Sequence, residues 1–164
     1  MGVYLDTNIF YNAYCPVESN ALADWVLNQL TPKLQGITCE WTILEMFRAL
    51  KKQVNLGTIG EQAAKVALDF FLSELGELSE EKKLKIVPVT RSAIMASRKQ
   101  IFEQNLYAAD ALHATTALAS QTQLFITFDS DFRGNLESIP ILNPADSDFK
   151  DKFNAIKKDV QSEE

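Results

Sequence analysis

Short apolar runs alternate along this chain with longer segments in which apolar residues recur every three or four positions. The short runs predict strands, which fall at residues 3–5, 37–39, 84–89, 124–127 and 139–142. The longer segments predict helices, which fall at residues 19–30, 42–54, 60–78, 90–104 and 107–120. This alternation predicts an α/β layer fold with a mainly parallel sheet.

Residues that favour turns and helix ends refine these boundaries. Pro16 and its polar neighbours predict a loop from Asn12 to Ser19. Thr42 is followed three residues later by Glu45, which is the spacing of a capping box and predicts the start of a helix. Pro140 makes residues 139–142 an edge strand, because proline lacks the backbone donor that an interior strand needs.

The end of the chain carries a pattern of its own. Phe149, Phe153 and Ile156 recur at helical intervals among charged residues. They predict an amphipathic C-terminal helix or tail, residues 146–164, in the same domain as residues 1–145. No repeat or linker divides the 164 residues, a length that suits one domain of about 150 residues.

Composition narrows the class of protein. The sequence is 46% apolar and 23% charged, as in ordinary soluble domains. We expect Cys15 and Cys39 to be reduced thiols in a cytoplasmic protein, because no basic leader precedes the first apolar run and no apolar stretch reaches the roughly 18 residues of a membrane span. The net charge of −6 argues against broad electrostatic capture of nucleic acid, so binding a polyanion needs a local basic patch or a metal centre.

Four acidic residues stand at the ends of predicted elements. Asp6 and Asp129 each follow a strand, whereas Glu45 and Asp110 fall in the first turns of two predicted helices. Ligands of parallel α/β sheets bind outside the carboxyl ends of the strands. We therefore expect the four carboxylates to share one cleft, with Asp131 close by.

Each of these acids also has a simpler explanation, as a helix-end or turn residue. Jointly the simple explanations weaken, because four carboxylates in one cleft repel one another unless cations neutralise them. An all-oxygen set suits Mg²⁺ or Mn²⁺, and the sequence has no Cys/His cluster for zinc. A metal pair held by carboxylates is typical of phosphoryl chemistry, in which the ions activate water and stabilise in-line displacement at phosphorus.

Four stretches, read together, resemble a known family. They are LDTNIF at residues 5–10, ILEMFRAL at 43–50, AADALHATTAL at 108–118 and ITFDSDF at 126–132. In this order they resemble the PIN domain and, within that family, the toxin ribonucleases of the VapC type. The resemblance covers nearly the whole chain, as far as Asn143.

The resemblance implies a three-layer α/β/α fold with a sheet of four to five mainly parallel strands. It implies Mg²⁺- or Mn²⁺-dependent cleavage of RNA, with the toxin acting as a homodimer and silenced by a small antitoxin protein. The predicted helices at 42–54 and 60–78 are the natural surface for both protein contacts, because their apolar residues spread over more than one face. The catalytic and metal-binding acids of the implied site are Asp6, Glu45, Asp110 and Asp129. Asp131 is a metal ligand of second rank, and Asn8 and Thr127 support the site by hydrogen bonding.

Further residues are candidates for contacts with RNA or for packing. Arg48, Lys51 and Arg133 are candidate RNA-binding residues, although each is also an ordinary surface charge. His113, one helical turn after Asp110, invites a general-base role, but water activated by metal makes such a base unnecessary. We therefore predict that His113 packs or forms hydrogen bonds.

Three alternative functions stay open. A haloacid-dehalogenase-like phosphatase also begins with a strand and an aspartate, but it needs a second aspartate where Asn8 stands. A non-catalytic PIN-like module that binds RNA or protein has no electrostatic reason to keep four acids together. A housekeeping RNA-processing PIN nuclease would share the whole predicted site, and the compact single domain favours the toxin only by analogy.

Overall fold

The computed structural model describes residues 1–132 and 134–162. Strands and helices alternate through this part of the chain, as the apolar pattern predicts. The elements are β1 (Gly2–Leu5), α1 (Thr7–Tyr14), α2 (Ala21–Asn28), β2 (Gln35–Cys39), α3 (Trp41–Asn55), α4 (Glu61–Glu80), β3 (Leu84–Val87), α5 (Arg91–Gln104), α6 (Ala108–Ala119), β4 (Leu124–Ile126), β5 (Asn135–Leu136), β6 (Ile139–Leu142) and α7 (Phe149–Ser162).

The strands form one sheet in the order β3-β2-β1-β4-β6-β5. All neighbouring pairs are parallel except the last, in which β5 runs antiparallel to β6. The sheet therefore has six strands rather than the predicted four to five, and β6 is not the edge strand that Pro140 suggested. The difference comes from β5, whose two residues are too few to produce a detectable alternation of apolar and polar positions.

A second difference lies directly after β1. Residues Thr7–Tyr14 form helix α1, so the predicted loop from Asn12 to Ser19 begins too early. Asp6 starts this helix, because its side chain accepts a hydrogen bond from the backbone N–H of Thr7. Ile9 and Phe10 then bury themselves completely in the core.

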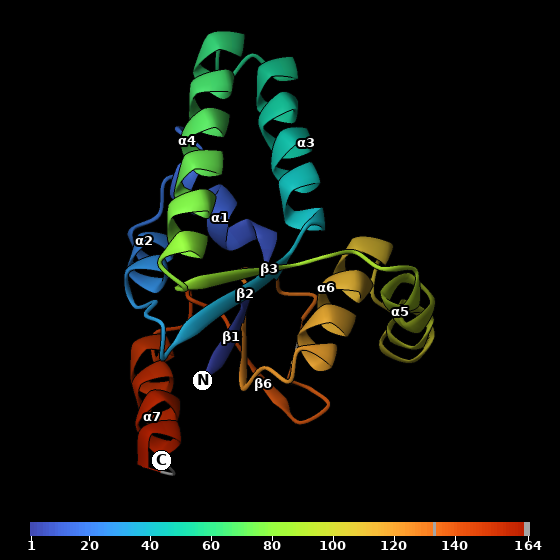
Figure 1. Ribbon diagram of the computed structural model, residues 1–164. Coiled ribbons are helices and arrows are strands. Elements are labelled where there is room, and N and C mark those ends of the chain that lie inside the picture. Colours follow the sequence, from blue (N-terminus) through green and yellow to red (C-terminus); the bar gives the residue numbers. More distant parts are fainter. Residues whose placement is uncertain (133, 163–164) are drawn as a thin grey trace.

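Helices cover both faces of the sheet (Figure 1), which gives the three layers that the resemblance implies. Val3 and Leu5 of β1 face one core cluster, which they share with residues of α1, α2, α3, α4 and α7. Tyr4, between them, faces a second cluster with Ala114 and Ala117 of α6. The small alanines let α6 lie close against the sheet, and α5 packs alongside α6.

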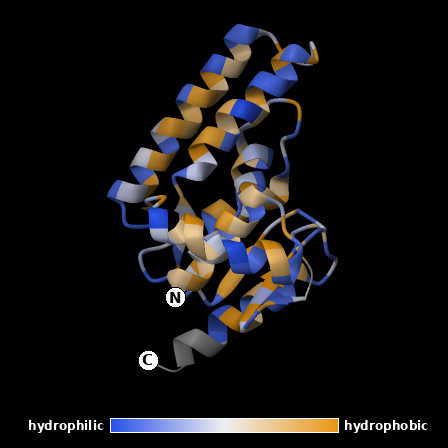
Figure 2. Ribbon diagram, turned by 90° about the vertical axis from the view of Figure 1, so that its right-hand side faces the viewer, coloured by the Kyte–Doolittle hydropathy of each residue, from blue (hydrophilic) through white to orange (hydrophobic). Residues whose placement is uncertain are grey.

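Helices α3 and α4 project together beyond the sheet as an arm (Figure 1). Coloured by hydropathy, hydrophobic and hydrophilic residues alternate along both helices (Figure 2). The large apolar side chains that remain exposed on them are Leu44, Phe47, Val66, Phe70 and Leu72. At the other end of the molecule, Phe149 and Phe153 of α7 pack on Trp25 of α2. Within the described residues, no helix has both the length and the apolar character needed to cross a bilayer.

Candidate functional site

The four predicted acids line one cleft of about 360 Å³ at the carboxyl edge of the sheet. Asp6 and Asp129 arrive from the ends of β1 and β4, which are neighbouring strands. Glu45 and Asp110 arrive from the starts of α3 and α6, which begin at the same edge. The chain thus joins carboxylates that lie far apart in the sequence.

Hydrogen bonds hold the carboxylate of Asp6 in one orientation. One oxygen accepts from the backbone N–H of Thr7 at 2.7 Å, and the other accepts from Asn8 Nδ2 at 2.7 Å and from Thr127 Oγ1 at 2.6 Å. Asn8 is fixed in turn, because its Oδ1 accepts from the backbone N–H of Phe128 at 2.9 Å. Asn8 and Thr127 therefore stand in the positions of supporting residues and tie β1 to the turn after β4.

Burial raises the pKa of Asp6, although these hydrogen bonds and the nearby His113 oppose the shift. The carboxylate is almost fully buried, with 5% of the residue exposed. Its charge is therefore costly in the metal-free protein, and a cation in the cleft would favour the ionised form.

Glu45 is held by one residue of α6 and one residue of α1. His113 Nε2 lies 2.7 Å from Glu45 Oε2, and the hydroxyl of Thr7 donates to the same carboxylate oxygen. On its other side, His113 Nδ1 lies 2.8 Å from the hydroxyl of Tyr4 and 3.6 Å from Cys39 Sγ. Glu45, His113 and Tyr4 thus form a buried chain of hydrogen bonds that runs from the cleft into the core.

These hydrogen bonds also shift the pKa values of His113 and Glu45. Burial opposes the charge on His113, but its contacts with Cys39 and Glu45 and the nearby Asp6 raise its pKa well above the ordinary value. Burial likewise opposes the charge on Glu45, yet His113 and Thr7 lower its pKa. The two shifts favour a charged His113 beside a charged Glu45, and both ring nitrogens of His113 have hydrogen-bond partners.

The capping box predicted from Thr42 and Glu45 is wrong. Helix α3 begins at Trp41, so that Glu45 lies in the second turn, and no side chain caps its start. Thr42 is buried, and its hydroxyl lies 2.7 Å from that of Thr38. Glu45 therefore does not cap the start of α3, and its side chain lines the cleft.

The pKa of Asp110 is shifted by its burial and by the neighbouring acids. Burial, followed by the charges of Asp6 and Asp129, raises the pKa of Asp110 to about 6. In the metal-free protein this carboxylate therefore exchanges its proton close to neutral pH.

We expect Asp110→Asn to stabilise the metal-free protein at pH 8 by roughly 1 kcal/mol, a value reduced for solvent screening because the side chain is only half-buried. Since the folded pKa lies above the ordinary 3.8, wild-type stability falls as the pH rises through about 6, whereas asparagine does not titrate. The difference should shrink as the pH falls through 6 and vanish below 3.8. Urea unfolding in EDTA at several pH values measures it.

The control for this prediction is Asp24→Asn, because Asp24 is an exposed acid of α2 outside the cleft. This substitution should not raise the free energy of unfolding at pH 8, because it relieves no repulsion among the carboxylates of the cleft. An Asp110→Asn protein that is less stable than wild type at pH 8 would contradict the repulsion inferred here.

The remaining predicted residues lie around the cleft in different ways. Arg48 lines it, but Lys52 lines it in place of Lys51. Glu45, Arg48 and Lys52 are spaced by three and four residues on one face of α3, and this helical spacing was the signal that distinguishes Lys52 from its neighbour. Asp131 is exposed and lines a separate, adjoining pocket, while Arg133 lies outside the described residues.

Two tyrosines of α1 take different positions in the structure. Tyr11 lines the cleft, where its hydroxyl accepts from Gln53 Nε2 at 2.6 Å. Tyr14 instead packs its ring against Phe70 and Phe71 at the base of the arm. Tyr11 is thus the aromatic residue that belongs to the cleft.

The donor chemistry of the cleft fits a hard divalent cation. Its ionisable ligands are carboxylates, and their mutual repulsion at Asp110 is what a cation would relieve. Within residues 1–132 and 134–162, however, no three Asp, Glu, His or Cys side chains stand close enough together to form a finished metal site. The carboxylates face a common space without closing around it, as repelling charges do.

The fold and the site define an α/β domain with an acidic cleft at the carboxyl edge of its sheet, and comparison with known proteins gives the family. A family model of the PIN domain matches residues 3–135, which is most of the chain, so the chain belongs to the PIN domain family. Comparison of the sequence with curated proteins gives no match. The match confirms the family and the three-layer fold predicted from the four sequence stretches.

Several solved structures share this fold. VapBC2 from Rickettsia felis, bound to a DNA fragment from the promoter, aligns with a TM-score of 0.62 at 18% identity, covering 87% of this chain and 98% of that chain. FitAcB from Neisseria gonorrhoeae aligns at 0.58 and 19%, covering 87% and 97%. VapC20 from Mycobacterium tuberculosis, a toxin that cleaves the sarcin–ricin loop, aligns at 0.55 and 14%, covering 83% and 93%. At these identities the likeness concerns the fold.

Proposed function

We propose that this protein is a metal-dependent endoribonuclease that hydrolyses phosphodiester bonds in RNA. The observation that carries the proposal is the single cleft lined by Asp6, Glu45, Asp110 and Asp129, in a chain of the PIN family. Four carboxylates around one cleft repel one another and so lower the stability of the metal-free protein. Such an arrangement is typical of a functional site, in which a bound cation relieves the repulsion.

In this proposal the four acids hold Mg²⁺ or Mn²⁺, and Asp131 is a ligand of second rank. When bound, the metal supplies positive charge for the phosphodiester and lowers the pKa of water. The protein supplies orientation: Asn8 and Thr127 fix Asp6, and His113 fixes Glu45.

The RNA meets a local basic patch in spite of the overall negative charge. Arg48 and Lys52 line the cleft from α3, on the same helix face as Glu45. They are placed to contact the phosphates that flank the scissile bond, since such contacts position a nucleic acid without reading its sequence. Lys51 and Arg133 are proposed as outer contacts.

The experiment that tests this function is cleavage of a labelled single-stranded RNA by the purified protein. We expect cleavage with Mg²⁺ or Mn²⁺, loss of cleavage in excess EDTA, and recovery when Mn²⁺ is added beyond the chelator. Single-stranded DNA of the same sequence is the control substrate. Cleavage that persists in EDTA would contradict a metal-dependent mechanism.

We further propose that the protein is the toxin of a type II toxin–antitoxin pair, acting in the cytoplasm as a homodimer. The support is the likeness of fold to toxins solved as toxin–antitoxin complexes, and the arm of α3 and α4 with its exposed apolar side chains. Such side chains on a projecting arm suit contacts with a second copy and with a small antitoxin.

A housekeeping RNA-processing nuclease is the alternative, since it would use the same cleft. The reading frame beside the gene distinguishes the two, because a toxin needs a small antitoxin encoded next to it. A non-catalytic RNA- or protein-binding module is the remaining alternative, and the cleavage experiment above decides against it or for it.

A further inference from the structure

A second pocket of about 370 Å³ adjoins the acidic cleft. It lies between the connection from α5 to α6 and the turn after β4, where Asp131 stands. Asp110 lines both the pocket and the cleft, so that the two hollows meet at this side chain. A chain-like substrate whose reacting group lies beside Asp110 therefore places a neighbouring group in the pocket.

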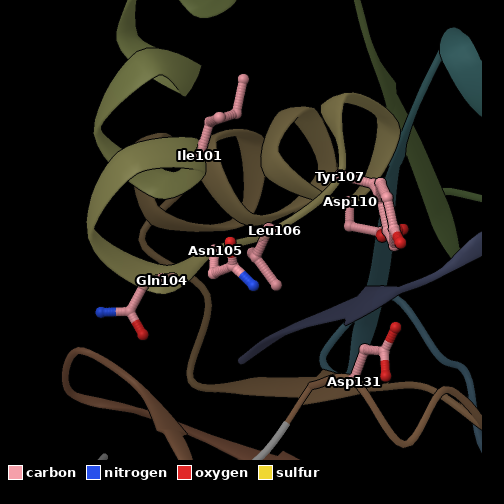
Figure 3. A pocket seen from close by; sticks show the side chains of 7 residues that line it. All are labelled: Ile101, Gln104, Asn105, Leu106, Tyr107, Asp110 and Asp131. Atoms are coloured by element: carbon pink, nitrogen blue, oxygen red, sulfur yellow. The ribbon is translucent and has the colours of Figure 1, made fainter.

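The aromatic side chain of Tyr107 forms part of the wall of this pocket (Figure 3). Helix α5 closes with Asn105 in the left-handed conformation, at φ 55°, and Leu106 packs into the second core cluster. Helix α6 begins immediately after Tyr107. The backbone of Tyr107 is thus anchored on both sides, and 76% of the residue is exposed. An uncovered aromatic ring is a platform on which a nucleobase stacks.

The polar groups of the pocket select the part of a nucleotide that fits. Its described lining contains the carboxylates of Asp110 and Asp131 and the amides of Gln104 and Asn105, and no lysine or arginine. Carboxylates repel a phosphate but accept hydrogen bonds from the N–H groups on the edge of a base. The volume also falls within the roughly 300–1,000 Å³ of small-molecule sites. The pocket therefore suits a neutral, planar group that carries N–H donors.

We propose that this pocket binds the nucleobase next to the scissile phosphate of a single-stranded RNA. Tyr107 stacks on the base, and Asn105 contacts its edge. The assignment rests on the proposed function for the position of the scissile bond, whereas the binding of a base to the pocket is independent of cleavage.

The test is the affinity of Tyr107→Ala for a fluorescein-labelled single-stranded RNA octamer of random sequence, followed by fluorescence anisotropy. Protein variants carry Asp6→Asn in addition, so that the RNA stays intact. Loss of one stacked base should weaken binding roughly 5- to 150-fold. Tyr107→Phe should retain the affinity, because the ring remains, and Asn105→Gly should weaken it without straining the left-handed backbone.

The matched control is Phe102→Ala. Phe102 is an equally exposed aromatic residue of α5, at 80%, but it does not line the pocket. An unchanged affinity for Tyr107→Ala, or an equal loss of affinity for Phe102→Ala, would overturn the assignment of this pocket to a nucleobase. Cleavage by the protein with Asp6 intact separates the two proposals: a Tyr107 effect without cleavage removes the nuclease alone, and cleavage without a Tyr107 effect removes the pocket alone.

Discussion

Replacing Asp6 with asparagine should abolish metal-dependent RNA cleavage, with a loss of more than roughly 100-fold, the upper end of what removing a mere supporting residue costs. Asparagine removes the negative charge on which the cation site is centred. It also brings an NH₂ group towards Asn8 and Thr127, which now donate to the carboxylate. Cleavage rates at saturating Mn²⁺ measure the effect.

The fold should survive this change. Asparagine is as good a helix N-cap as aspartate, so the start of α1 remains, and the cost of burying the charge disappears. We expect the free energy of unfolding to stay within about 1 kcal/mol of wild type. Asp151→Asn, at an exposed site on α7, is the control and should leave cleavage unchanged. Full activity of Asp6→Asn would remove the assigned site.

Replacing His113 with alanine should damage both stability and the cleft. Tyr4 and Glu45 would lose their shared partner in the core, and Glu45 would lose its counter-ion. We expect the free energy of unfolding to fall by about 3 kcal/mol. We also expect the affinity for Mn²⁺ to fall roughly 10- to 100-fold, because His113 holds a proposed metal ligand without touching the metal. Urea unfolding and calorimetric titration with Mn²⁺ measure the two effects.

Thr115→Val is the matched control on the same helix. Thr115 is buried, and within the described residues its hydroxyl has no hydrogen-bond partner. Removing that hydroxyl should leave the Mn²⁺ affinity unchanged and raise stability by about 1 kcal/mol. If His113→Ala binds Mn²⁺ as tightly as wild type does, then His113 serves the core and not the cleft.

The sequence predicted those parts of the site that depend on local pattern. Asp6 and Asp129 follow apolar runs, and the edge to which parallel strands deliver such residues is a general property of α/β sheets. Glu45 was placed in the cleft for a partly wrong reason, because the capping-box spacing suggested a helix start where the chain has already entered α3. Helical spacing from Glu45 would have selected Lys52 over Lys51.

Other features depend on contacts between distant segments and leave no local pattern. The partners of His113 come from β1, β2 and α3, and nothing in the sequence around residue 113 indicates them. Strand β5 exists because β6 pairs with it, and helix α1 is too short for a clear apolar period. Tertiary contacts determine whether such short elements form, because they override the local secondary-structure propensity.

The strand order has a consequence for synthesis on the ribosome. Strand β1 is made before both of its neighbours, β2 and β4, and β4 follows it about 120 residues later along the chain, with Asp129 directly behind. Asp6 depends on Thr127 for its orientation, so the earliest residue of the cleft waits for one of the latest. A partly synthesised chain therefore has no assembled cleft, and under the proposed function it is harmless to the messenger RNA and ribosome that are making it.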